Sequence, residues 1–146
     1  MNRTEYHALV FTGFVRAAKL NVDLMKLDQT DEPDIRCTVS GEVVGYELTA
    51  ATDGEFEELA TQRPSGRVNW FRPDIVCSAF AKVWRRYKYD LPTELIVHEG
   101  PAPLLPVSAW EDDLETMLRI HFKESGFRRL WVINPWKPEI LYRWLQ

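Results

Sequence analysis

The chain has 146 residues, of which 45% are hydrophobic and 12% aromatic, and it carries a formal net charge of −4. This length can bury one sizeable core but leaves little room for a second, so we expect a single domain over residues 1–146. The acidic charge argues against non-specific coating of nucleic acid, which depends on neutralising phosphates with Lys and Arg, but it is compatible with a local basic groove.

Cysteine usage and hydropathy indicate the compartment. Cys37 and Cys77 lie in apolar stretches without C-x-x-C spacing, which predicts buried free thiols rather than a zinc site or a disulfide framework. No stretch reaches the roughly 18 apolar residues that a membrane span needs, and the first residues lack a charged segment followed by an apolar run. We therefore expect a cytoplasmic location.

The first half of the chain predicts a helix, a strand and a hairpin. Apolar side chains recur with a mostly helical period over residues 4–19. Uneven apolar alternation over residues 21–27 predicts a short strand, which a polar run then ends. The β-branched runs 35–39 and 43–49, separated by Ser40-Gly41-Glu42, have the sequence form of an antiparallel hairpin.

The second half predicts strands that alternate with helices. In chain order we expect an exposed excursion over residues 51–73, a helix from 74 to the region of 90, a strand at 94–98, a loop at 100–106, a helix at 110–124 and strands at 130–133 and 140–144. Such alternation calls for a mixed sheet covered by helices. The predicted fold class is therefore α/β, with a central mixed β-sheet flanked by helices.

Two carboxylates occupy corresponding ends of the predicted hairpin strands. Asp34 stands at the start of one strand, and Glu47 lies thirteen positions later near the end of the next. Antiparallel pairing brings both to one end of the sheet, where two like charges on one face are costly unless they share a cation. Magnesium suits such a pair because it keeps several waters and takes one or two carboxylates plus phosphate oxygens. The pattern predicts a magnesium site for phosphoryl transfer.

The context of these acids resembles a known family. Pro33-Asp34, followed after a gap by Gly45-Tyr46-Glu47-Leu48-Thr49, is similar to the signature of the PD-(D/E)xK nuclease superfamily, which implies a restriction-endonuclease-like fold. In that family the Asp and Glu bind magnesium, and a lysine two residues after the Glu orients or activates the attacking water. Here that position is Thr49, which cannot supply a positive charge. Some members take the lysine from the following helix, and the I-x-x-x-A-x-x-K run of Ile75, Ala79 and Lys82 offers Lys82 for this role.

The resemblance implies an endonuclease that hydrolyses phosphodiester bonds with Mg²⁺ or Mn²⁺ as its cofactor. It implies Asp34, Glu47 and the backbone carbonyl of Leu48 as metal ligands, with Glu5 on the first helix as an outer ligand. Lys82 would stabilise developing negative charge or position the attacking water.

The expected partner is nucleic acid, and DNA in particular. Arg85, Arg86 and Lys88 follow Lys82 closely and are expected to contact the phosphate backbone without reading bases. The competing interpretation of these basic residues is a solvated helix end, which the helix dipole favours.

Other interpretations stay open at this point. Thr49 and the acidic net charge also suit a catalytically inactive nuclease-fold protein that acts as a protein-binding or regulatory module. A homodimer is a further alternative, with the aromatic last strand or Trp136 at the contact. His7, His98 and His121 fall in three different elements, which gives a histidine metal site little support.

Overall fold

The structure is a computed structural model that describes residues 1–28, 33–51, 74–100 and 105–145. The excursion expected at 51–73 therefore lies outside the described residues except for Ala51, as does the 101–104 part of the expected loop. None of the described helices is long and apolar enough to cross a membrane.

The described elements follow the predicted order closely. They are α1 (Arg3–Ala18), β1 (Val22–Leu27), β2 (Ile35–Val39), β3 (Glu42–Ala50), α3 (Asp74–Val83), β4 (Thr93–His98), the 3₁₀ helix η1 (Val107–Ala109), α4 (Glu111–His121), the 3₁₀ helix η2 (Phe122–Glu124), β5 (Arg129–Asn134) and β6 (Glu139–Leu145).

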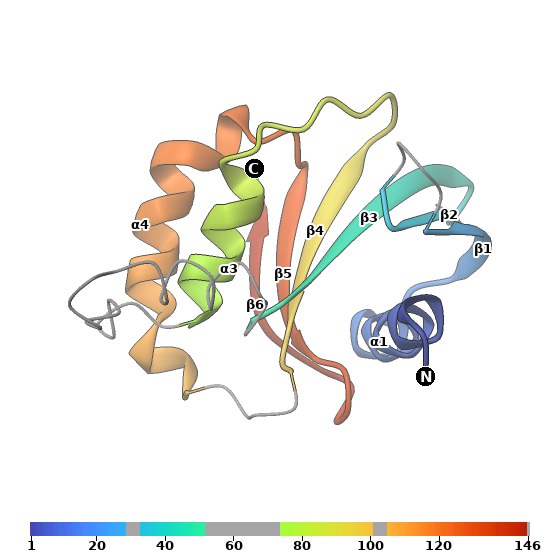
Figure 1. Ribbon diagram of the computed structural model, residues 1–146, viewed down its shortest axis with the longest axis horizontal. Helices are drawn as coiled ribbons and strands as arrows, with labels where there is room; N and C mark the ends of the chain where they lie inside the picture. The colour runs from blue at the N-terminus through green and yellow to red at the C-terminus, as the bar shows by residue number, and fades with distance from the viewer. Residues whose placement is uncertain (29–32, 52–73, 101–104, 146) are drawn as a thin grey trace.

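The six described strands form one mixed sheet in the order β1-β2-β3-β4-β5-β6 (Figure 1). β1, β2 and β3 pair antiparallel, β3, β4 and β5 pair parallel, and β6 returns antiparallel to β5. The parallel pairs need crossovers, and these run through α3 and α4. The predicted α/β class with a central mixed sheet is confirmed.

Helices cover both faces of the sheet. α1 packs on one face and α3 and α4 pack on the other, as Figure 1 shows. Alternation along the buried strands follows this division: Ile96 joins the cluster under α1, whereas Leu95 and Val97 join the cluster under α3 and α4. In β3 the side chains of Tyr46 and Leu48 pack under α1. The intervening Glu47 therefore points to the side of α3.

The turn between β2 and β3 sets the register of the hairpin. Ser40 and Gly41 have φ values of 49° and 88°, the positive values that a two-residue hairpin loop needs at both positions. Because the loop has two residues rather than the three expected, β3 begins at Glu42, which pairs with Val39. The register continues to Ile35 opposite Tyr46. One residue beyond this pair, Asp34 lies opposite Glu47.

The segment after α3 departs from the prediction. The helix ends at Val83 rather than near residue 90, because Arg86 adopts a left-handed φ of 52° and the Tyr87 N–H donates to the Ser125 carbonyl at 2.9 Å. Tyr87 and Tyr89 then stack with ring centroids 5.2 Å apart. The expected end of the helix is thus a non-helical segment over residues 84–92, the strap, and it brings Tyr89 to the sheet.

The two cysteines form no disulfide. Cys37 is fully buried under α1, and burial raises the pKa of its thiol to about 11. Cys77 on α3 is only half-buried. The expectation of buried free thiols holds fully for Cys37.

Candidate functional site

Asp34 and Glu47 converge at the sheet end where β2 begins. Only 7% of Asp34 and 8% of Glu47 is exposed. Asp34 Oδ2 accepts a hydrogen bond from the Leu48 backbone N–H at 2.8 Å, which ties the start of β2 to β3. Burial, and then the charge of Asp34, raise the pKa of Glu47 above its ordinary value. The two acids are therefore close enough to repel each other.

Lys82 and Tyr89 both reach Glu47. The Lys82 ammonium lies 3.6 Å from Glu47 Oε1, and the Tyr89 hydroxyl donates to Oε2 at 3.0 Å. Both contacts favour the ionised carboxylate and oppose the effect of burial on its pKa. Ile75 and Ala79 anchor the inner face of α3 in the core, so the side chain of Lys82 is held with only 15% of its surface exposed.

Thr49 follows Glu47 by two residues in β3, so strand alternation puts both on the same face of the sheet. Thr49 is 5% exposed. A lysine ammonium nevertheless stands beside Glu47, supplied by α3 rather than by the strand. The geometry thus places Lys82 beside Glu47, and its catalytic role stays a prediction.

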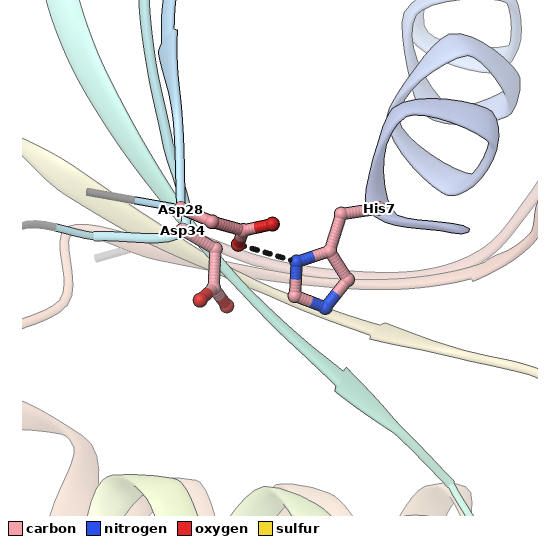
Figure 2. A group of neighbouring side chains, drawn as sticks. All are labelled: His7, Asp28 and Asp34. Carbon is pink, nitrogen blue, oxygen red and sulfur yellow. Dashed lines mark hydrogen bonds and ion pairs between the residues drawn. The ribbon is translucent and has the colours of Figure 1, made fainter. Parts of the chain in front are cut away.

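A histidine joins the acids from the other side. Figure 2 shows His7 on α1 facing Asp28 at the end of β1, and His7 Nδ1 lies 2.7 Å from Asp28 Oδ1. Together with Asp34, these residues offer ligand atoms that all lie within 4.8 Å of one another. The expectation of little support for a histidine metal site is therefore wrong in geometry, because α1 packs across the sheet end and brings His7 to two carboxylates.

Asp28 has a carboxylate oxygen that a cation at this position would satisfy. Its Oδ2 is buried and has no hydrogen-bond partner among the described residues. A buried carboxylate oxygen without a partner is costly, and a divalent ion would satisfy it. Asp34 Oδ1 lies 3.3 Å from Arg3, whose side chain is 73% exposed and free to move away. The residues present therefore fit a metal ion held by His7, Asp28 and Asp34, with Glu47 beside Asp34.

Glu5 does not reach this group. It is exposed in the first turn of α1, where its carboxylate accepts from the Asn2 amide at 3.1 Å while its backbone N–H donates to Asn2 at 2.8 Å. These contacts cap the helix. The expectation of Glu5 as an outer ligand is therefore wrong in position. The residue of the first helix that reaches the acids is His7, two positions later.

The expected nucleic-acid contacts lie beyond the end of α3 and are all exposed. Arg85 donates to the Tyr87 hydroxyl at 3.2 Å, and Arg86 pairs with Glu124 at 3.2 Å. Lys88 is exposed on the same strap. Leu48 donates its backbone N–H to Asp34, whereas the resemblance implied its backbone carbonyl as a metal ligand.

His98 is buried beside the site at the end of β4. Its Nδ1 lies 2.9 Å from the Glu99 carbonyl, which can only accept, so Nδ1 carries the proton and Nε2 is left with its lone pair. Burial is the main cause that lowers the pKa of His98 to about 4, and His7 acts in the same direction. The imidazole is neutral at pH 7.

Three of these residues carried no usable sequence signal. His7 lies within an ordinary helical pattern, Asp28 opens a polar run that reads as a turn, and Tyr89 falls in the expected end of a helix. Each reaches the site through packing between separate elements, which no local sequence pattern shows.

Glu94 is a third buried acid, and both of its carboxylate oxygens have partners within the protein. Arg128 contacts its Oε2 at 2.7 Å, and the Trp131 indole N–H donates to Oε1 at 2.7 Å. A carboxylate with strong donors on both oxygens links strands and has no oxygen left for a ligand. Glu94 is structural.

Comparison with protein-family models, with curated proteins and with solved structures gave no match. The function of the chain must therefore be inferred from the geometry of the site.

Proposed function

We propose that this chain is a divalent-metal-dependent nuclease of restriction-endonuclease-like fold, acting on nucleic acid in the cytoplasm. The observation that carries the proposal is the position of Asp34 between two groups: Glu47 with Lys82 on one side, and His7 with Asp28 on the other. A hairpin that presents buried acids at a sheet end next to a lysine also supports the proposed fold and family.

The donor set suits manganese as well as magnesium. Carboxylate oxygens are the ligands that Mg²⁺ and Mn²⁺ prefer, whereas imidazole nitrogen favours transition metals. An ion bound here supplies Lewis acidity toward a phosphodiester oxygen. With His7 among the ligands, we expect Mn²⁺ to bind more tightly than Mg²⁺.

The protein groups around the ion have separate tasks in this proposal. Asp34, held by the Leu48 N–H, and Glu47, held by Tyr89, keep their carboxylates in fixed positions. Lys82 holds positive charge next to them in a nearly buried place, where electrostatic stabilisation of a phosphorane-like charge is stronger than in water. Arg3, at the exposed rim, can exchange its contact with Asp34 for a substrate phosphate.

One observation favours the second candidate, an inactive nuclease-fold module. Both oxygens of Glu47 already have partners within the protein, Lys82 and Tyr89. An acid satisfied in this way can serve stability alone. The two candidates differ in one measurable property, because only the nuclease needs the ion.

The test combines metal binding and cleavage. Purified protein is titrated with Mn²⁺ and Mg²⁺ by calorimetry and incubated with plasmid, single-stranded and branched DNA and with RNA. We expect micromolar to millimolar metal binding and cleavage that Asp34→Asn and Glu47→Gln both reduce at least a hundredfold. Glu139→Gln, at an exposed acid of β6, is the matched control and should change neither.

Circular dichroism and the thermal midpoint of each variant establish that it folds. Cleavage that survives both Asp34→Asn and Glu47→Gln contradicts the nuclease proposal. Folded protein that neither binds metal nor cleaves any of these substrates assigns the chain to the inactive module.

A further inference from the structure

A groove of about 320 Å³ lies between α1 and the turn that joins β5 to β6. Leu9, Gly13 and Arg16 line it from α1, and Pro135 and Trp136 line it from the turn. Leu9 is 48% exposed and Trp136 is 49% exposed, although both are large apolar side chains. The groove therefore offers an aromatic ring and an aliphatic wall to the solvent, with one guanidinium at its side.

The turn holds Trp136 in a fixed place. Asn134 Oδ1 accepts the backbone N–H groups of Trp136 at 3.0 Å and Lys137 at 3.2 Å. Gly13 lets α1 approach the turn so closely that a Cβ there would stand 2.3 Å from the Pro135 carbonyl oxygen. These contacts fix the backbone that carries the ring, and the ring itself contacts Tyr6 with centroids 6.0 Å apart, so less conformational entropy is lost when a ligand stacks on it than for a ring on a mobile loop.

An aromatic path connects the groove with the metal-ligand group. Trp136 and Tyr6 have ring centroids 6.0 Å apart, and Tyr6 and His98 have centroids 5.7 Å apart. The residue after Tyr6 is His7, whose Nδ1 lies 2.7 Å from Asp28. A ligand seated on Trp136 would thus continue along α1 to the acids.

We propose that Trp136 and Tyr6 form a stacking surface for unpaired bases, so that the substrate of the site is single-stranded nucleic acid. This inference depends on the proposed nuclease function for its biological role. In a duplex the bases are stacked on each other, so an exposed protein ring can stack only on bases that are unpaired. Arg16 lines the same groove and suits the phosphate next to such a base.

The charge of the protein agrees with this substrate. With a net charge of −4, phosphate neutralisation alone gives weak binding, and base stacking provides affinity without requiring many cations. Among the described residues Arg16 makes no ion pair, so its charge is available to a ligand. An apolar groove could also hold a peptide or a second copy of the chain, but the guanidinium and the continuity with the metal-ligand group favour a nucleotide.

The test measures binding separately from cleavage. Labelled single-stranded DNA, single-stranded RNA and duplex DNA of the same sequence are titrated by fluorescence anisotropy in EDTA, which prevents metal-dependent cleavage. We expect both single strands to bind more tightly than the duplex. Trp136→Ala should weaken single-strand binding tenfold to a hundredfold, on the order of one or two stacked bases, while Trp136→Phe keeps most of it.

Two further variants serve as controls. Trp84→Ala removes a similarly exposed tryptophan that packs on Phe80 and His121, on the opposite side of the sheet, and should weaken single-strand binding far less than Trp136→Ala does. Arg16→Gln should weaken binding a fewfold and reduce its salt dependence by about one phosphate contact.

Equal affinity for single strands and duplex, or unchanged binding by Trp136→Ala, overturns the inference. A shift from dimer to monomer in Trp136→Ala without loss of single-strand binding also overturns it, because the groove then belongs to a second copy of the chain. Cleavage that is unchanged in Trp136→Ala supports the nuclease proposal and removes the stacking surface. Trp136-dependent binding without any cleavage in Mn²⁺ or Mg²⁺ supports the stacking surface and removes the nuclease.

Discussion

Replacing Lys82 by Met should destabilise the protein by leaving Glu47 buried without its cation. At the observed 3.6 Å separation and an effective dielectric constant of about 20, the attraction is roughly 4–5 kcal/mol. Removing one partner of a buried ion pair typically costs about 3–5 kcal/mol. The Tyr89 hydrogen bond remains and the Lys82 side chain is 15% exposed, so we expect a loss of about 3 kcal/mol. For a chain of this size that lowers the thermal midpoint by about 6–12 °C.

The pH dependence of this loss identifies its cause. The pKa of Glu47 is raised in the folded state, so the proton it binds there stabilises the fold at low pH, and that contribution is lost as the pH rises through the folded pKa. Without Lys82 the folded pKa rises further. The deficit should therefore be large at pH 8 and smaller at pH 5, measured by urea unfolding at both values.

The control is Lys88→Met, at an exposed lysine on the strap after α3, and it should change stability by less than about 0.5 kcal/mol. A Lys82→Met protein as stable as the wild type at pH 8, or one with the same deficit at both pH values, would refute the reasoning.

Two other predictions concern His98 and Gly13. The folded pKa of His98 is about 4, below its ordinary value, so the unfolded chain binds the proton first as the pH is lowered. The free energy of unfolding should therefore decrease by up to about 3 kcal/mol as the pH is lowered from about 6.5 to 4. Urea unfolding should show this slope in the wild type and a flatter one in His98→Gln. Gly13→Ala places a Cβ 2.3 Å from the Pro135 carbonyl oxygen, so we expect a loss of about 1–3 kcal/mol by thermal unfolding, whereas Ala17→Gly, on the same helix, should lose about 1 kcal/mol or less.

The hairpin and its two acids could be predicted because the relevant information is local. The β-branched runs and the Ser40-Gly41 turn determine which residues of β2 and β3 face each other, and that register alone places Asp34 beside Glu47. Lys82 could also be predicted, because the helical periodicity in α3 is strong and the resemblance implied its role. Its contact with Glu47 still depends on how α3 crosses the sheet, which no local pattern determines.

The rest of the site could not be predicted because it depends on tertiary packing. His7 reaches Asp28 only through the way α1 lies across the end of the sheet, and a helical pattern shows which face is apolar but not where that face docks. The same limit explains Glu5, which the resemblance implied as an outer ligand on the first helix but which lies on the exposed side of that helix. Tyr89 was missed because a left-handed residue, Arg86, ends α3 early, and arginine is not a residue that marks such a stop.

The two-residue turn at Ser40 and Gly41 has a consequence for how this sequence can diverge. Insertions in surface loops usually cost little, so relatives can differ widely in loop length. Because β3 is also held by β4, a single insertion here would shift β2 against β3 and move Asp34 away from its place opposite Glu47. Lineages that keep this arrangement of Asp34 and Glu47 should therefore hold this loop at constant length while its residues vary, and lineages that have lost the arrangement should be free to lengthen it.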